Sequence, residues 1–200
     1  MLISVTLENW MSFNEPVTFS MVAGKQRRHL HRVPKLEKYH KRILPIAAIF
    51  GANASGKSNF FKAIEFAENM VTRNLNSQNS GIPVHPYKLD NAKLDQPSRF
   101  SFELLIENVI YCYAFAVTKT KVVAESLSKF TSSGAEKFLF KRDENKILFD
   151  SFYSDTESEL QTIYKGTDSA QLFVHNAASQ KRDEFKFIYN WFQINLLTVD

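Results

Sequence analysis

The chain has 200 residues, of which 44% are apolar, and its formal net charge is +4. That apolar content excludes an intrinsically disordered chain, and the length suits one large domain or two small lobes around one core. The single cysteine, Cys112, excludes an internal disulfide framework and fits a reducing cytoplasm. No apolar run is long enough to span a bilayer, so we expect a cytoplasmic protein without membrane contact.

The amino-terminal residues predict an antiparallel hairpin. Residues 1–7 are rich in aliphatic and β-branched side chains, and residues 17–22 alternate between apolar and polar side chains. Both patterns are typical of strands, and the segment 8–15 between them is turn-like. We therefore expect two paired strands at the start of the chain.

The segment 24–42 is strongly basic. It holds eight lysines and arginines against one carboxylate, Glu37, so it carries +7 and the rest of the chain −3. One interpretation is a solvated loop with a short helix; another is an electropositive rim for nucleotide phosphate or nucleic acid. A metal site at His29, His31 and His40 lacks a cysteine or paired carboxylates, and we do not favour it.

Residues 51–58 match the pattern G-x-x-x-x-G-K-[ST] at every fixed position. The apolar run 43–50 predicts a buried strand before the motif. Residues 59–73 place their apolar side chains at helical spacing, which predicts a helix after it. A strand, a glycine loop and a helix are the context in which backbone amides and a helix amino terminus surround a phosphate.

This motif predicts that the chain binds ATP and Mg²⁺. Lys57 would reach the outer phosphates, Ser58 would be the metal ligand, and the amides of residues 53–58 would surround the β-phosphate. No Asn-Lys-x-Asp motif that reads guanine is present, which favours ATP over GTP. The predicted cofactor-binding residues of the loop are Gly51, Asn53, Ala54, Ser55, Gly56, Lys57, Ser58 and Asn59.

The second half of the chain begins with a polar connection at residues 74–91. Residues 98–150 then contain apolar, β-rich runs separated by short polar turns, which predicts an antiparallel meander of about five strands. Residues 151–168 are polar and acidic without a clear period. We expect another strand at 170–175 and a terminal helix at 180–197.

Together these segments resemble the first lobe of an ATP-binding-cassette head. The similarity is closest to SMC/RecF-like ATPases, and more narrowly to bacterial "AAA-family ATPase" proteins of the overcoming-lysogenization-defect and abortive-infection kind. The resemblance implies an α/β P-loop NTPase fold with an antiparallel β subdomain, in which residues 1–73 form the hairpin, basic loop and strand–loop–helix. It rests on Leu2-Ile3, Glu8-Asn9-Trp10-Met11-Ser12-Phe13, residues 44–59, Tyr111-Cys112-Tyr113-Ala114-Phe115, Glu125-Ser126-Leu127 and Tyr189-Asn190-Trp191-Phe192.

The resemblance also implies a function. Such proteins dimerise head to head and trap ATP between the Walker A motif of one subunit and an LSGGQ-like motif of the other. Many work beside a nuclease or toxin in phage defence. We therefore predict Mg-ATP binding by this chain and, in the complete protein, hydrolysis that drives dimer closure.

The sequence departs from the family at several positions. Met11 stands where a basic residue is usual, and Glu125-Ser126-Leu127-Ser128 is a poor imitation of LSGGQ. Residues 196–200 have the apolar run and Asp of a Walker B motif, but we favour a helix end followed by a strand. We expect the second lobe beyond residue 200, which would make the chain a fragment with weak or no turnover.

Gln180 is the candidate for the family's Q-loop glutamine, which contacts Mg²⁺ and water. It follows the apolar run 172–174. A plain glutamine at the start of a helix is the interpretation that we favour.

Two other functions compete with ATP binding by an ATPase head. The first is a nucleic-acid-binding module that uses residues 25–42, with nucleotide as a regulator. The second is a P-loop kinase, which the long β meander after the P-loop helix disfavours.

Overall fold

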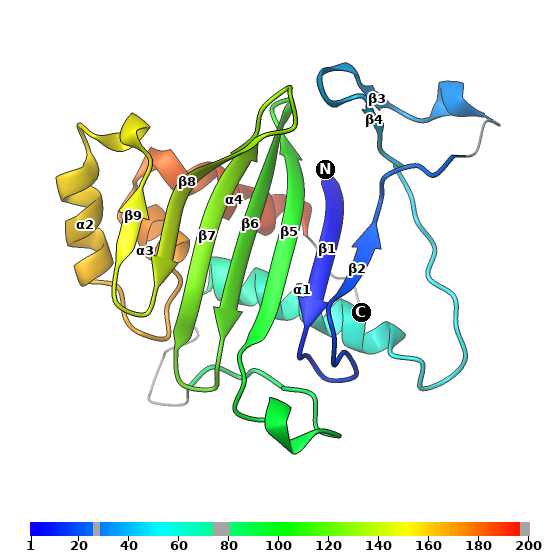
Figure 1. Ribbon diagram of the computed structural model, residues 1–200, viewed down its shortest axis with the longest axis horizontal. Helices are drawn as coiled ribbons and strands as arrows, with labels where there is room; N and C mark the ends of the chain where they lie inside the picture. The colour runs from blue at the N-terminus through cyan, green and yellow to red at the C-terminus, as the bar shows by residue number, and fades with distance from the viewer. Residues whose placement is uncertain (26–28, 74–80, 197–200) are drawn as a thin grey trace.

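The computed structural model describes residues 1–25, 29–73 and 81–196, and these build one large sheet with helices on one face (Figure 1). The described strands of that sheet follow the order β2-β1-β5-β6-β7-β8-β9, and each neighbouring pair is antiparallel. Their bounds are β1 Leu2–Glu8, β2 Val17–Ser20, β5 Ser98–Ile106, β6 Val109–Val117, β7 Val122–Phe130, β8 Glu136–Asp143 and β9 Ile147–Phe149.

The sheet confirms the predicted hairpin and meander. β1 pairs with β2, and β5 to β9 follow one another along the chain and across the sheet. The connection between β5 and β6 is only Glu107-Asn108, and both residues have positive φ, +49° and +62°. Two left-handed residues give the tight turn whose twist suits paired strands.

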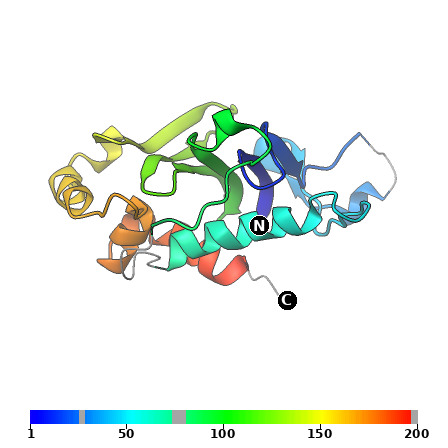
Figure 2. The ribbon, with the colours of Figure 1, turned by 90° about the horizontal axis from the view of Figure 1, so that it is seen from below.

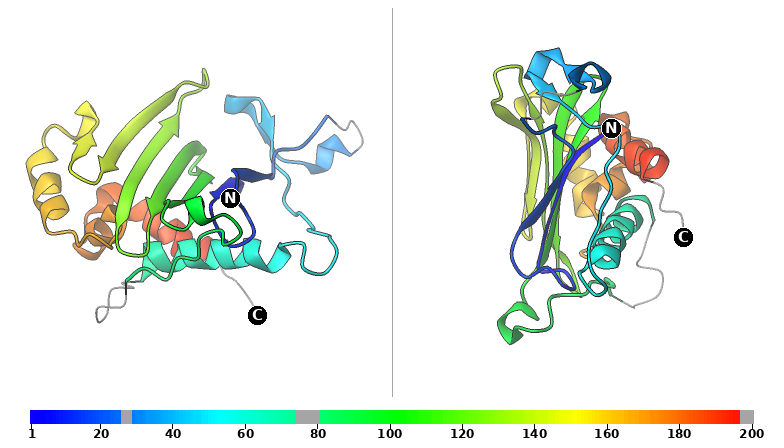
Figure 3. Two further views of the ribbon diagram at one scale, coloured as in Figure 1. Left: turned by 60° about the horizontal axis from the view of Figure 1, so that its bottom comes forward. Right: turned by 90° about the vertical axis from the view of Figure 1, so that its right-hand side faces the viewer.

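The helices cover one face of the sheet (Figures 2 and 3). α1 and α4 lie across the strands, and α2 packs beside the edge strand β9. On β5, Phe100, Phe102 and Leu104 are buried while Arg99 is exposed, because successive side chains point to opposite faces. The helix bounds are α1 Lys57–Thr72, α2 Glu157–Lys165, α3 Phe173–Ser179 and α4 Asp183–Asn195.

The periodicity of α1 explains its position. Its buried side chains are Phe60, Ala63, Phe66, Ala67, Met70 and Val71. Their spacing places them on one stripe of the helix, which packs on the apolar face of the sheet. The predicted helices at 59–73 and 180–197 are thus confirmed, with α4 beginning at Asp183.

The strand predicted at 43–50 is wrong. Ile43 forms one isolated bridge with Val22, and the residues after it form no ladder with any described strand. Ile46 is 80% exposed and Phe50 is 90% exposed. An apolar run becomes a buried strand only where neighbours accept its hydrogen bonds, and no described strand lies beside this run.

The strand predicted at 170–175 is also wrong, because α3 begins at Phe173. A short apolar run fits a buried strand or a buried helix equally well, and its period cannot decide between them. Residues 151–168 show no clear helical or strand periodicity of apolar side chains, yet α2 forms within them and buries Leu160 and Ile163. The prediction for residues 197–200 lies outside the described residues.

The basic segment is an ordered arm over residues 29–42. It contains two 3₁₀ turns, Leu30–Arg32 and Glu37–Tyr39, and a small ladder of β3 (Lys35–Leu36) with β4 (Lys41–Arg42). Tyr39 anchors the arm to the sheet: its hydroxyl donates to the Phe130 carbonyl at 3.1 Å and accepts from the Ile110 N–H at 3.1 Å. Two further 3₁₀ turns cover Asn91–Lys93 and Ser151–Tyr153.

Candidate nucleotide-binding site

Residues 51–58, called the phosphate loop below, run into the amino terminus of α1. Gly56 has φ +93°, a left-handed conformation that favours glycine. A Cβ at Gly56 would also lie 2.8 Å from the Ser12 hydroxyl oxygen, and one at Gly51 would lie 2.6 Å from the Ser55 hydroxyl oxygen. The left-handed φ therefore requires glycine at position 56, whereas the close contact at Gly51 is with the end of the Ser55 side chain.

The Lys57 side chain folds back over the loop. Its Nζ donates to the carbonyls of Gly51 and Ala52, both at 2.8 Å, and to Ser55 Oγ at 3.4 Å. Among the described residues, no carboxylate forms an ion pair with Lys57. The ammonium is thus fixed at the loop and its charge is available to an anion.

The start of α1 is open to an anion as well. No side chain caps the helix, and its first turn contains no acidic residue. The first N–H groups of a helix have no intrahelical partner and carry partial positive charge. The exposed Ser58 hydroxyl lies in this first turn, where the motif places a metal ligand.

The turn between β1 and β2 holds the loop in place, a role that the sequence did not reveal. Asn59 Nδ2 donates to Ser12 Oγ at 3.1 Å, and Trp10 Nε1 donates to the Asn59 carbonyl at 2.9 Å. The Trp10 ring packs on Phe66 and Phe100, with centroids 5.0 and 5.4 Å away. Asn59 therefore acts through both its backbone and its side chain.

Asn9 is a second residue that the sequence did not single out. It is 1% exposed, and its side chain accepts from Tyr87 N–H at 3.0 Å and donates to the carbonyls of Lys93 and Gln96, both at 2.9 Å. These bonds hold residues 85–97 against the end of β1. These three partners of Asn9 are 78 to 87 residues away in the chain, so no local sequence pattern signals them.

The structure does not bring Gln180 to the phosphate loop. Gln180 is the exposed C-cap of α3 and donates to the Asn176 side chain at 3.2 Å, so it ends a helix and does not begin one. α3 meets α1 at its carboxyl end, where His175 Nδ1 lies 2.9 Å from the Val71 carbonyl. Lys57 and Val71 are fourteen residues apart in α1, about 21 Å along the axis.

The other candidate motifs are not sites in the described part of the chain. Within residues 1–25, 29–73 and 81–196, no group of three histidine, cysteine or carboxylate side chains could hold a metal, so His29, His31 and His40 form no such cluster. Glu125 to Ser128 lie within β7, which has a neighbouring strand on each side, and Glu125 is 1% exposed. A strand inside the sheet cannot act as an exposed signature loop.

Glu125 instead forms a buried ion pair. Its Oε2 lies 3.2 Å from Arg142 Nη1, and its carboxylate accepts the N–H groups of Phe173 and Val174 at 2.6 and 3.0 Å. Tyr113 donates its hydroxyl to Glu125 Oε1 at 2.9 Å, and burial raises the pKa of Tyr113 well above its ordinary value. The carboxylate therefore joins the sheet to the start of α3.

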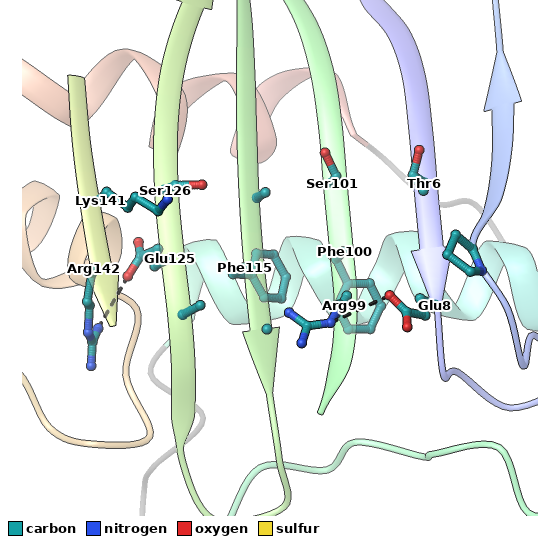
Figure 4. Close-up of a pocket in the computed structure, with 14 residues that line it drawn as sticks. Thr6, Glu8, Arg99, Phe100, Ser101, Phe115, Glu125, Ser126, Lys141 and Arg142 are labelled. Carbon is teal, nitrogen blue, oxygen red and sulfur yellow. Dashed lines mark hydrogen bonds and ion pairs between the residues drawn. The ribbon is translucent and has the colours of Figure 1, made fainter. Parts of the chain in front are cut away.

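A separate cavity of about 390 Å³ lies on the other face of the sheet (Figure 4). Short side chains such as Ser101 and Ser126 line it, and Arg99 pairs with Glu8 at 3.5 Å on one side. Figure 4 shows α1 behind the strands, so this cavity and α1 lie on opposite faces of the sheet.

The comparison with protein families agrees with this geometry. A family described as "AAA domain, putative AbiEii toxin, Type IV TA system" matches residues 46–185. The chain belongs to this family. The match includes the phosphate loop, the meander and α3, and it confirms an AAA/ABC-like P-loop ATPase of the abortive-infection type. No curated protein matches the chain.

Membership in the family indicates that this domain is a P-loop, nucleotide-binding ATPase domain. The described helices include none that is long and apolar enough to cross a bilayer.

Proposed function

We propose that the phosphate loop binds Mg-ATP. The fixed position of the Lys57 ammonium over the loop, beside uncapped amides at the start of α1, carries this proposal. Lys57 would neutralise the outer phosphates, Ser58 would hold Mg²⁺, and the amides of residues 53–58 would surround the β-phosphate. When bound, Mg²⁺ supplies charge neutralisation between the phosphates.

Titration calorimetry with Mg-ATP tests this function. Lys57→Ala removes the ammonium, and we expect binding to weaken by about tenfold or more, because charge-assisted hydrogen bonds are the strong ones. Lys62→Ala is the matched control, since it removes an exposed lysine from the same helix away from the loop. Equal affinity in the two variants would disprove the assignment.

We further propose that two chains close head to head around ATP and that turnover needs groups beyond this site. The need for added groups is supported by the place of Glu125 to Ser128 inside strand β7, where they cannot serve as a signature loop. The chain alone would then bind ATP and hydrolyse it weakly. A turnover number in the ordinary range of about 1–10³ s⁻¹ would contradict the need for added groups.

The family name points to an abortive-infection or toxin–antitoxin setting. We propose that a toxin or nuclease in the cytoplasm binds this protein in its ATP-bound state. Copurification with such a partner in the presence of ATP, and its loss with Lys57→Ala, is the expected result.

Nucleic-acid binding by the basic arm is a second candidate. The side chains of Lys35, Lys38 and Lys41 are exposed on an arm that Tyr39 fixes to the sheet. Lys35 forms an ion pair with Glu37 at 2.5 Å, and the Lys38 ammonium lies 5.2 Å from the centre of the Tyr39 ring. Arg27 and Arg28 lie outside the described residues. Phosphate contacts would make binding fall steeply with salt. Unchanged duplex binding by Lys38→Glu/Lys41→Glu would remove this candidate.

A further inference from the structure

The strand β2 is an open edge of the large sheet. It pairs with β1 on one side, and no described strand pairs with it on the other side. The opposite edge differs, because α2 packs beside β9 and Gln161 of α2 donates to the Ile147 carbonyl at 3.2 Å. An uncovered edge presents backbone N–H and C=O groups with which another strand can pair.

The open part of this edge is β2 itself. Just beyond it, Val22 forms its bridge with Ile43, and the Leu44 N–H donates to the Met21 carbonyl at 2.7 Å. This cover ends at Pro45, which has no N–H to continue a ladder. In Figure 1 the run that follows β4 turns away from β2, and its described residues form no ladder with that strand.

The residues of β2 do not protect the edge. Natural edge strands are often protected by charged side chains or by proline within the strand. Val17–Ser20 contains neither, and Val17 is 47% exposed. In the run that leaves the edge, Ile46 is 80% exposed and Phe50 is 90% exposed. Burial of these apolar groups would favour the addition of a strand.

The charges at the two ends of β2 are opposite in sign. Glu15 precedes the strand, and its carboxylate is largely exposed, 3.5 Å from the Lys93 ammonium. The exposed Lys25 follows the strand, and β4 with the exposed Lys41 lies at the same end (Figure 1). When two copies of one strand pair antiparallel, the start of each meets the end of the other. The acidic end of one copy then faces the basic end of the other, whereas parallel pairing would bring like charges together.

We propose that two copies of this chain pair through their β2 strands, antiparallel and about a two-fold axis. Every neighbouring pair of described strands in the large sheet is antiparallel, so the sheet continues in the same pattern across the axis. Such a contact uses the same surface on both copies and closes after two chains. It needs no nucleotide, and it therefore goes beyond the proposed function.

Sedimentation equilibrium without nucleotide measures this association. We expect the wild-type protein to form dimers in a fraction that rises with concentration. Thr18→Lys adds a charge to an exposed position of the edge, and the two-fold axis brings two such lysines near each other. We expect the dissociation constant of the dimer to rise about tenfold or more, because like charges across an interface are strongly unfavourable.

Thr18→Val is the matched control, because it keeps a β-branched side chain on the edge without adding a charge. It should dimerise as the wild type does. Glu15→Lys is the second variant; it places like charges at both ends of β2 and should also weaken the dimer. Glu15→Lys/Lys41→Glu exchanges the two charges and should recover part of that loss.

Amide hydrogen exchange locates the contact. Residues 17–20 should exchange more slowly at concentrations at which dimers form, because pairing covers their outward N–H groups. Slow exchange that does not depend on concentration would mean that the chain's own run 46–50 covers the edge, and it would overturn the inference. Fast exchange of residues 17–20 in the dimer would overturn it too.

The same measurements separate this inference from the proposed function. Wild-type protein that stays monomeric without nucleotide, or a dimer that is equally stable in Thr18→Lys, would overturn pairing through β2. A dimer that forms only with Mg-ATP and is unaffected by Thr18→Lys would support head-to-head closure and still exclude this contact. Loss of Mg-ATP binding in Lys57→Ala leaves pairing through β2 unchanged.

Discussion

Trp10 donates its indole N–H to the backbone carbonyl of Asn59 across 2.9 Å, which joins the β1–β2 turn to the first turn of α1. The bond links an element of the sheet to the helix that carries Lys57. The same Trp10 ring packs on Phe66 of α1 and Phe100 of β5. The position of the phosphate loop therefore depends on packing in the core as well as on the loop's own sequence.

Trp10→Phe keeps an aromatic ring in the core but removes the indole donor. A typical intramolecular hydrogen bond contributes about 0.5–1.5 kcal/mol, and the smaller ring adds a packing loss, so we expect a lower free energy of unfolding. We also expect weaker Mg-ATP binding, because the start of α1 loses its tether. Urea unfolding and calorimetry measure the two effects. Unfolding and binding both at wild-type values would show that the tether is unimportant.

Gly56→Ala is expected to abolish nucleotide binding. The left-handed φ of +93° disfavours a side chain, and the new Cβ would meet Ser12 Oγ at 2.8 Å. Gly24→Ala is the matched control, because a Cβ there has no atom within 4 Å. Calorimetry should show normal binding for Gly24→Ala and none for Gly56→Ala. Normal binding by Gly56→Ala would refute the shape assigned to the loop.

Glu125→Gln is expected to destabilise the fold by about 3–5 kcal/mol, because it leaves the buried Arg142 without its counter-charge. Glu125→Gln/Arg142→Met removes both charges and should recover part of that loss. Glu144→Gln breaks the exposed pair with Lys121 and should cost less than about 1 kcal/mol. Chemical unfolding of the three variants provides the comparison. If Glu125→Gln and Glu144→Gln lower the free energy of unfolding by the same amount, the buried ion pair does not contribute specially to the stability of the fold.

Stability should fall at alkaline pH because of Tyr153. Burial raises the pKa of Tyr153 to about 12 from an ordinary value of 10.0. The folded state therefore favours the neutral phenol, so this contribution is complete below pH 10 and is lost as pH rises towards 12. Tyr153→Phe removes the titrating group and should flatten the decline in urea midpoint between pH 10 and 12. If the urea midpoint of Tyr153→Phe declines as steeply as that of the wild type, the loss of stability comes from other groups, such as Tyr113.

The sequence predicted those parts of the fold that local patterns determine. The apolar stripe of α1 and the two-residue turn at Glu107-Asn108 each depend on neighbouring residues, and both elements formed as expected. The run 43–50 had the composition of a strand but lacks a described neighbour to pair with. Its outcome depends on tertiary context, which composition does not contain.

The candidate site divides in the same way. The glycines and Lys57 of the phosphate loop could be predicted from the sequence, because phosphate binding by the loop requires these residues at a fixed local spacing. Asn9, Trp10 and Glu125 each bond to backbone groups at least 48 residues away, so no short stretch of sequence displays their roles. Gln180 was a Q-loop candidate only by its order along the chain, and the helix that it ends meets the opposite end of α1.

Amide chemical shifts of the isotope-labelled chain, measured by NMR during a titration with Mg-ATP, test most directly whether this loop binds nucleotide. We expect the largest changes at the amides of residues 53–58, where the backbone would donate to phosphate. In Lys57→Ala the changes at residues 53–58 should vanish at the same ligand concentration. Shifts confined to another region, or no shifts at saturating Mg-ATP, would contradict nucleotide binding by the phosphate loop.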